Sequence, residues 1–190
     1  MFVKNFYYYY TKLFSDQFCD YVIRKGKELV EQDGKVGSSG KGKKDNKIRD
    51  SKITWIKDRD ILEPVLQTIE AANRKAEWDF HLDLNLDITA QFTKYGLNQF
   101  YHWHRDCDIS NRNRKLSFIL NLSEPSDYQG GHLEFDFKNQ GGKGRFEKMT
   151  VARERGSCII FPSFMFHRVK PVKKGTRYSL VVWVTGPNWR

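Results

Sequence analysis

The chain has 190 residues and a formal net charge of +10, a length at which one domain buries about 70% of its unfolded surface without disulfides. Its three cysteines, Cys19, Cys107 and Cys158, form no C-x-x-C pair, which argues against a disulfide framework or a zinc knuckle and for a reducing compartment. No apolar run approaches the roughly 18 residues of a membrane span, and the aromatic start lacks the aliphatic core of a signal peptide. We therefore expect one domain over residues 1–190 that is soluble, cytoplasmic and without a membrane partner.

The N-terminal part reads as helical support around a polar loop. Ser15 is placed to cap a helix that runs to about Glu31, and a second apolar periodicity predicts a helix over 60–76. Residues 33–47 have a single aliphatic side chain and predict a mobile loop. Residues 35–52 contain seven Lys or Arg residues but only two Asp, so this segment is strongly basic. Such a stripe can bind nucleic acid, but a solvated loop explains it more simply, so nucleic acid is not the expected partner.

From residue 81 the apolar period changes from helical to alternating. Apolar residues occupy every second position from Leu82 to Phe92, which is typical of a half-buried strand. Short strand-like runs then follow, at 99–106, 115–122, 132–137, 157–161, 166–172 and 177–184. Turn residues separate them, among them Gly141-Gly142. Helices followed by many short strands predict an α+β, mainly β, chain in which residues 81–190 form a jelly-roll core.

A metal-binding pattern lies in the predicted strand 99–106. His104 and Asp106 are two positions apart, so both project from one face, and His167 can approach them from a later strand. Two imidazoles and one carboxylate leave three positions of an octahedral ion open, as in non-haem Fe(II) oxygenases. His102 shares the same parity, so an H-x-H site of the cupin type is an alternative, although it leaves Asp106 unexplained. His81 and His132 read as surface or hydrogen-bonded residues.

The last predicted strand carries an anion-binding pattern. Arg177 and Ser179 share one face, while Leu180 and Val182 share the other. A guanidinium beside a hydroxyl suits a buried carboxylate, which Arg grips through two parallel N–H bonds. The alternative is an ordinary surface arginine on an edge strand.

A resemblance to a known family runs from about Tyr95 to Pro187, which is about half of the chain. Five segments carry it: "YGLNQFYHWHRD", "RKLSFILNLS", "YQGGHLEF", "GSCIIFPSFMFHRVKPV" and "GTRYSLVVWVTGP". They resemble the 2-oxoglutarate- and Fe(II)-dependent dioxygenases, in particular the prolyl 4-hydroxylase branch with its PKHD-type hydroxylases. The resemblance implies a double-stranded β-helix (jelly roll) with N-terminal supporting helices, and Fe(II) held by the catalytic residues His104, Asp106 and His167.

The same resemblance assigns the cosubstrate and substrate residues. Arg177, where prolyl 4-hydroxylases more often have Lys, binds the distal carboxylate of 2-oxoglutarate, assisted by Ser179 and Tyr95. Arg114 lies near the substrate. The segment "IRDSKITWI" resembles one that closes over peptide, which makes Arg49 and Trp55 candidate contacts, although Trp55 can equally be a core residue.

A further position departs from the family. Where the family often has Glu-Thr after Gly130-Gly131, with the Thr touching 2-oxoglutarate, this chain has His132-Leu133, so that contact is lost.

The implied activity is hydroxylation of peptidyl proline with O₂, Fe(II) and 2-oxoglutarate, releasing succinate and CO₂, with ascorbate as a stimulant and a proline-containing peptide or protein as partner. The carboxylate at Asp106 favours hydroxylation over halogenation. Three alternatives stay open: a free amino acid or other small-molecule hydroxylase, a nucleic-acid demethylase, and a non-catalytic binding module. Demethylases usually carry a second arginine six residues after the first, where this chain has Trp183.

Overall fold

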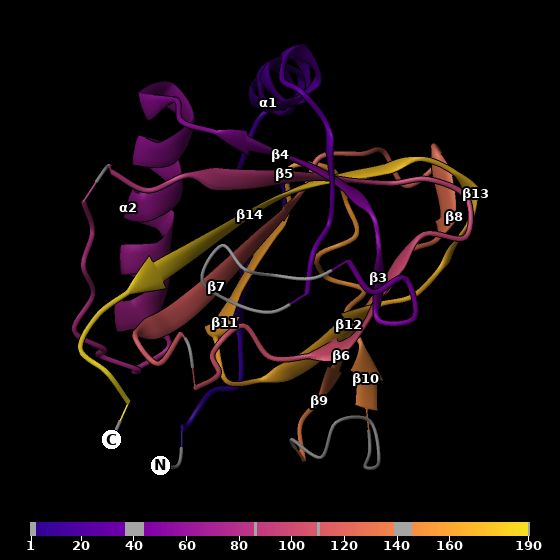
Figure 1. The fold of residues 1–190 in the computed structure, drawn as a ribbon. Coiled ribbons are helices and arrows are strands. Elements are labelled where there is room, and N and C mark those ends of the chain that lie inside the picture. The colour runs from indigo at the N-terminus through magenta and orange to yellow at the C-terminus, as the bar shows by residue number, and fades with distance from the viewer. Residues whose placement is uncertain (1–2, 37–43, 86, 110, 139–145, 190) are drawn as a thin grey trace.

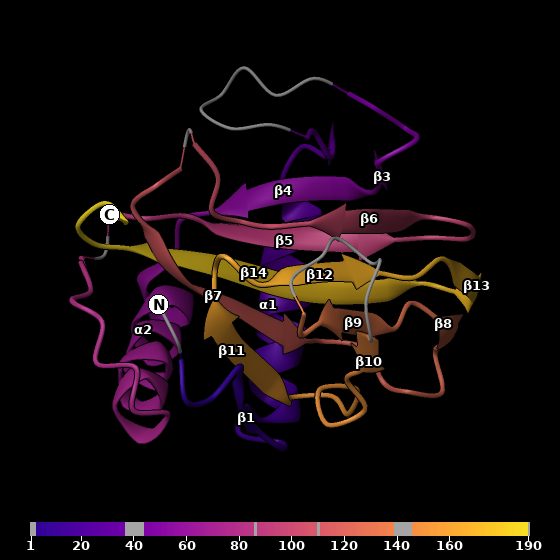
Figure 2. The ribbon, with the colours of Figure 1, turned by 90° about the horizontal axis from the view of Figure 1, so that it is seen from below.

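The computed structural model describes residues 3–36, 44–85, 87–109, 111–138 and 146–189. Two sheets form a jelly roll, and two helices cover the outer face of the larger sheet (Figures 1 and 2). Part of the predicted mobile loop (37–43), Leu86 and the expected turn at Gly141-Gly142 lie outside the described residues. The N-terminal 80 residues supply short strands as well as the predicted helices.

Both helices begin at the expected side chains. Helix α1 (Asp16–Glu28) is capped by Ser15, whose side chain accepts a hydrogen bond from the Phe18 N–H, and Asp58 caps α2 (Arg59–Lys75) by accepting from the Asp60 N–H. Each cap satisfies a backbone N–H that has no partner within its helix. Pro64 lies in the early part of α2. The two predicted helices are therefore confirmed, within two or three residues at their ends.

The larger sheet has seven strands in the order β1-β11-β7-β14-β5-β4-β2. Its strands are β1 (Tyr8–Tyr10), β2 (Gln32–Asp33), β4 (Lys52–Ile56), β5 (Ala90–Tyr95), β7 (Arg114–Asn121), β11 (Cys158–Pro162) and β14 (Arg177–Thr185). One face of this sheet packs against α1 and α2 in a continuous apolar core. The other face looks toward the smaller sheet (Figure 2).

The smaller sheet has five strands in the order β10-β9-β12-β6-β3, and β8 and β13 form a separate pair. These strands are β3 (Arg49–Asp50), β6 (Phe100–His104), β8 (Tyr128–Gly130), β9 (Leu133–Asp136), β10 (Phe146–Lys148), β12 (Phe166–Val169) and β13 (Val172–Gly175). A second apolar core fills part of the space between the two sheets. The rest of that space is a cavity.

The predicted strand at 81–92 is wrong in its first part. Strand β5 begins only at Ala90, and the segment before it makes one isolated bridge, between Asp83 and Thr185. Leu82, Leu84 and Ile88 nevertheless pack against the core under the helices. The alternation of apolar and polar residues therefore predicted correctly which side chains face the core. It did not predict strand pairing, because an extended segment can bury every second side chain without hydrogen bonds to a neighbouring strand.

All three cysteines are free thiols in the structure, and Cys19 and Cys158 are buried. None of the helices in the described part of the chain combines the length and the apolarity that crossing a lipid bilayer requires.

Candidate active site

Three potential metal ligands converge between the two sheets. His104 ends β6, Asp106 follows two residues later, and His167 lies on β12 directly opposite His104. The Asp106 carboxylate is 3.7 Å from His104 Nε2 and 3.5 Å from His167 Nε2. All three ligand atoms lie within 4.8 Å of one another, and no other such cluster of three occurs among the residues that the structure describes.

Hydrogen bonds orient each of these ligands. The Nδ1 of His104 is 2.8 Å from the carbonyl oxygen of His102, and that of His167 is 3.0 Å from the carbonyl oxygen of Met165. A carbonyl only accepts, so Nδ1 donates in both rings and the lone pair at Nε2 is left for a metal. The Ser117 hydroxyl donates to Asp106 at 2.7 Å, which fixes the carboxylate from behind.

The protonation states of these side chains also suit metal binding. Burial, and then the neighbouring His167, lowers the pKa of His104 well below its usual value. Burial alone would raise the pKa of Asp106, but His167, His104 and the Ser117 hydroxyl together hold it below its usual value. The neutral imidazole and the carboxylate are the forms that bind metal. This donor set fits Fe(II) with one side left open.

A β-bulge decides which histidines take part. His104 pairs with His167 but Tyr101 pairs with Val169, so β6 holds one extra residue between the two pairs. The bulge brings Tyr101 onto the side of His104, with their rings stacked at a centroid distance of 3.4 Å. His102 is exposed instead. The H-x-H alternative is therefore wrong, because the simple alternation on which it depended is broken.

The two remaining histidines behave as expected. His81 is exposed, and His132 lies 3.0 Å from a guanidinium nitrogen of Arg153.

A cavity of about 280 Å³ opens beside the three ligands. It is lined by all nine residues that the sequence singled out: Arg49, Trp55, Tyr95, His104, Asp106, Arg114, His167, Arg177 and Ser179. The sequence reasoning missed three residues that complete the site: Tyr101, Ser117 and Trp183. Ser117 and Trp183 are direct partners across β7 and β14, and the alternation from Ser179 along β14 could have placed Trp183 in the cavity.

The predicted anion-binding residues, Arg177 and Ser179, are buried at one side of this cavity. Arg177 pairs with Tyr95 across β14 and β5 and is only 4% exposed. It forms no ion pair with a carboxylate of the described residues. A buried guanidinium without an anion is costly, so this position suits an anionic ligand. Burial raises the pKa of Tyr95, so its hydroxyl remains a donor at neutral pH.

Two tryptophans, Trp55 and Trp183, line the cavity from the inner face of the larger sheet. Trp55 is 41% exposed and its ring lies 6.3 Å from that of Trp183, so the core alternative for Trp55 is wrong. The Arg114 guanidinium lies 4.4 Å from the centre of the Trp183 ring and donates to the Asp106 carbonyl oxygen at 3.2 Å. These contacts hold Arg114 close to the metal ligands.

Comparison with known proteins decides the family. The model of the 2OG-Fe(II) oxygenase superfamily matches residues 90–185, about half of the chain. The chain belongs to this superfamily. A PKHD-type hydroxylase of Picosynechococcus sp. is 38% identical over 97 residues, which are 50% of this chain and 41% of that protein. The chain therefore spans less than half the length of this curated relative.

Solved structures of the superfamily confirm the jelly-roll fold over nearly the whole chain. A Pseudomonas putida prolyl-4-hydroxylase superimposes with a TM-score of 0.72 at 21% identity, covering 96% of this chain and 94% of that one. A Trichoplax adhaerens prolyl hydroxylase, solved with a peptide of the hypoxia inducible factor, gives 0.68 at 18% identity and covers 96% and 84%. At these identities the likeness concerns the fold.

Proposed function

We propose that this 2OG-Fe(II) oxygenase hydroxylates peptidyl proline in a 2-oxoglutarate- and O₂-dependent reaction that releases succinate and CO₂. The observation that carries the proposal is one shared cavity, in which His104, Asp106 and His167 lie beside the Arg177 guanidinium, which has no ion pair among the residues that the structure describes. A metal site that leaves coordination positions open next to a carboxylate site is what this cosubstrate needs.

Each residue then has a defined task. His104, Asp106 and His167 hold Fe(II), while Arg177 pairs with the distal carboxylate of 2-oxoglutarate and Tyr95 and Ser179 donate hydrogen bonds to it. When bound, Fe(II) with 2-oxoglutarate and O₂ supplies an oxidation in which one oxygen atom enters succinate and the other converts a substrate C–H to C–OH. The protein orients that C–H bond and restricts access of water.

Peptidyl proline is supported by the PKHD-type relative and by the prolyl hydroxylase neighbours, one of them solved with a peptide. Trp55 and Trp183 give the cavity an apolar wall on which a proline ring can pack. Arg114 supplies donors for the peptide backbone, and Arg49 is a further substrate contact in the same cavity. Ascorbate is expected to stimulate turnover by keeping the iron reduced.

A coupled assay tests the proposal. Protein loaded with Fe(II) is supplied with 2-oxoglutarate, O₂ and a proline-rich peptide, and succinate and the peptide mass are followed. We expect succinate formation that the peptide stimulates, with a peptide mass gain of one oxygen atom. Succinate without a modified peptide would reject proline and leave free amino acids, then methylated nucleic acid, as the substrates to assay. No succinate under any of these conditions would reject the activity.

A further inference from the structure

A second buried arginine, Arg49 on β3, is among the residues that line the same cavity. Arg49 is 5% exposed, and its guanidinium carbon lies 4.6 Å from the centre of the Tyr101 ring. Tyr101 is in turn stacked on His104. One aromatic ring therefore separates Arg49 from a proposed metal ligand.

The hydrogen bonds of Arg49 leave one of its nitrogens unused. Its Nε donates to the Ser51 hydroxyl at 2.8 Å and its Nη1 donates to the Lys35 carbonyl oxygen at 3.3 Å. Both of these acceptors are neutral. Its Nη2 is buried and has no partner among the residues that the structure describes. A β-carbon on Gly34 would lie 2.5 Å from Nε, so the backbone closes tightly over this side of the guanidinium.

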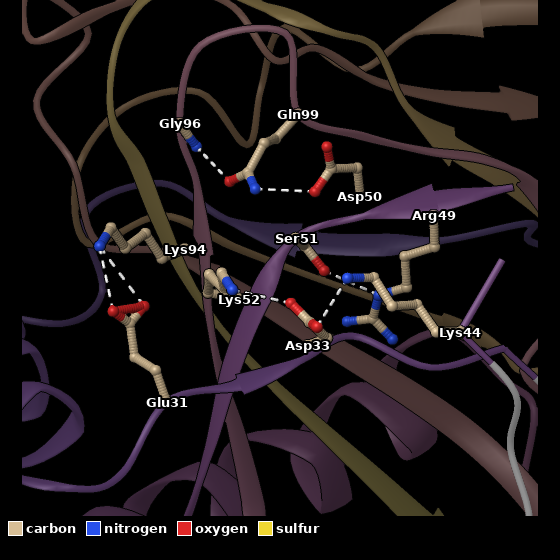
Figure 3. A network of polar contacts seen from close by, with 10 residues as sticks. All are labelled: Glu31, Asp33, Lys44, Arg49, Asp50, Ser51, Lys52, Lys94, Gly96 and Gln99. Carbon is tan, nitrogen blue, oxygen red and sulfur yellow. Dashed lines mark hydrogen bonds and ion pairs between the residues drawn. The ribbon is translucent and has the colours of Figure 1, made fainter. Parts of the chain in front are cut away.

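The neighbouring carboxylates are committed elsewhere (Figure 3). Asp33 is held between Lys44 at 2.8 Å and Lys52 at 2.7 Å, and Asp50 accepts from Gln99 at 2.8 Å. Arg49 itself makes no ion pair within the described part of the chain.

We propose that Arg49 binds a carboxylate of the substrate, so that the preferred substrate carries an anionic group next to the carbon that is hydroxylated. This inference rests on the proposed function and narrows its substrate class. In a peptide the carboxylate is either the free C-terminus at the target residue or an adjacent acidic side chain. A neutral peptide carbonyl would satisfy the N–H of Nη2 but not the buried charge.

The remaining features of the site favour a carboxylate over a larger anion. Nη1 and Nη2 form the edge of the guanidinium that suits two carboxylate oxygens. The cavity of about 280 Å³ must also hold the cosubstrate, which leaves room for a small group. The distal carboxylate of 2-oxoglutarate has its own partner in Arg177, so the two guanidiniums serve two different molecules.

Matched peptide pairs test this assignment. One pair is a short peptide ending in proline with a free C-terminus or a carboxamide. The second pair is a capped peptide with Glu or Gln beside proline. Binding to the anaerobic complex with Fe(II) and 2-oxoglutarate is followed by tryptophan fluorescence, since Trp55 and Trp183 line the cavity, and the KM of each peptide is followed by succinate release.

We expect the carboxylate member of at least one pair to bind about 10- to 100-fold more tightly than its neutral partner. The pair that shows the difference identifies the source of the carboxylate. Arg49→Gln should abolish the difference, Arg49→Lys should retain part of it, and neither should change the requirement for 2-oxoglutarate.

Equal binding, or no binding, in both pairs would overturn the assignment. So would a preference that survives Arg49→Gln, or an Arg49→Gln variant that loses affinity for 2-oxoglutarate instead. Hydroxylation of the neutral peptides, followed as peptide-stimulated succinate release and a peptide mass gain of one oxygen atom, reports separately on the proposed activity. If it persists while both pairs bind equally, only the role of Arg49 is rejected.

Discussion

On strand β14 the two faces of the larger sheet are about equally buried but differ in chemistry. On β14, Leu180 and Val182 point to the helices and are completely buried in an apolar core. Arg177 and Ser179 point to the other face and are almost as buried, at 4% and 2% exposed, yet both are polar. Burial therefore does not separate core from site. What marks the site is a buried charged group, Arg177, that has no ion pair within the described part of the chain.

The contrast has a structural cause. Helices α1 and α2 close the outer face with apolar side chains, so a charge there would have neither water nor a partner. The inner face is closed by the second apolar core at one part and left open at the cavity. The same strands can therefore carry stability on one side and binding groups on the other. Substitutions on one face should therefore leave the properties of the other face unchanged.

The largest expected effect is on the cavity side. His167→Ala should reduce Fe(II)-dependent turnover by more than about 100-fold, because one of three ligands is lost. Its free energy of unfolding should change by less than about 1 kcal/mol. Steady-state succinate release and urea denaturation measure the two quantities. His81→Ala, at an exposed imidazole, is the matched control and should keep full activity.

On the helix side the effects should be reversed. Leu180→Ala should lower the free energy of unfolding by about 2–5 kcal/mol, because it leaves a void in a closed core. At a temperature where the variant is folded, its affinity for 2-oxoglutarate should match that of the wild type. A loss of affinity without a loss of stability would show that the two faces are coupled.

Removal of the Arg177 guanidinium should have an intermediate effect, on the affinity for 2-oxoglutarate. Arg177→Ala should raise the 2-oxoglutarate concentration needed for half-maximal turnover by about 10- to 100-fold, equivalent to about 1.4–2.8 kcal/mol of a charge-assisted hydrogen bond. Arg177→Lys keeps the charge and should recover most of the affinity. An unchanged requirement in Arg177→Ala would place the cosubstrate pocket elsewhere.

The smallest effect concerns Asp33, an exposed carboxylate at the cavity. Hydrogen bonds from Lys44 and Lys52 lower the pKa of Asp33 to about 2. Because the folded pKa lies below that of the unfolded chain, its contribution to stability is complete above about pH 4 and is lost as the pH falls toward 2. Lys52→Met should raise the pKa of Asp33 toward its usual value, measured by NMR titration of the carboxyl carbon. A pKa that stays near 2 in Lys52→Met would show that this lysine does not hold the carboxylate.

The parts of the fold that a sequence can predict are those with long periodicity. The two helices and β14 carry enough alternating or helical positions to show their buried faces. Strands β2 and β3 have two residues each, too few to show any period. Their pairing depends on partners that are distant in the sequence. From the sequence alone, the N-terminal part therefore shows only helices and a loop.

The candidate site shows the same limit. The pattern of His104, Asp106, His167 and Arg177 could be read from spacing and resemblance because strand parity holds along β14 and β12. Strand parity fails on β6, where the bulge turns His102 outward and Tyr101 inward. Ser117 could not be found either, since only the pairing of β7 with its neighbours brings its hydroxyl to Asp106.

The most direct test of the shared cavity is an anaerobic titration of the metal-free protein with Fe(II) and 2-oxoglutarate, followed by visible absorption. We predict a weak charge-transfer band that needs both additions, is absent in His167→Ala, and requires more 2-oxoglutarate in Arg177→Ala. A folded wild-type protein that binds Fe(II) but gives no band with 2-oxoglutarate would contradict the assignment of His104, Asp106, His167 and Arg177 to one site.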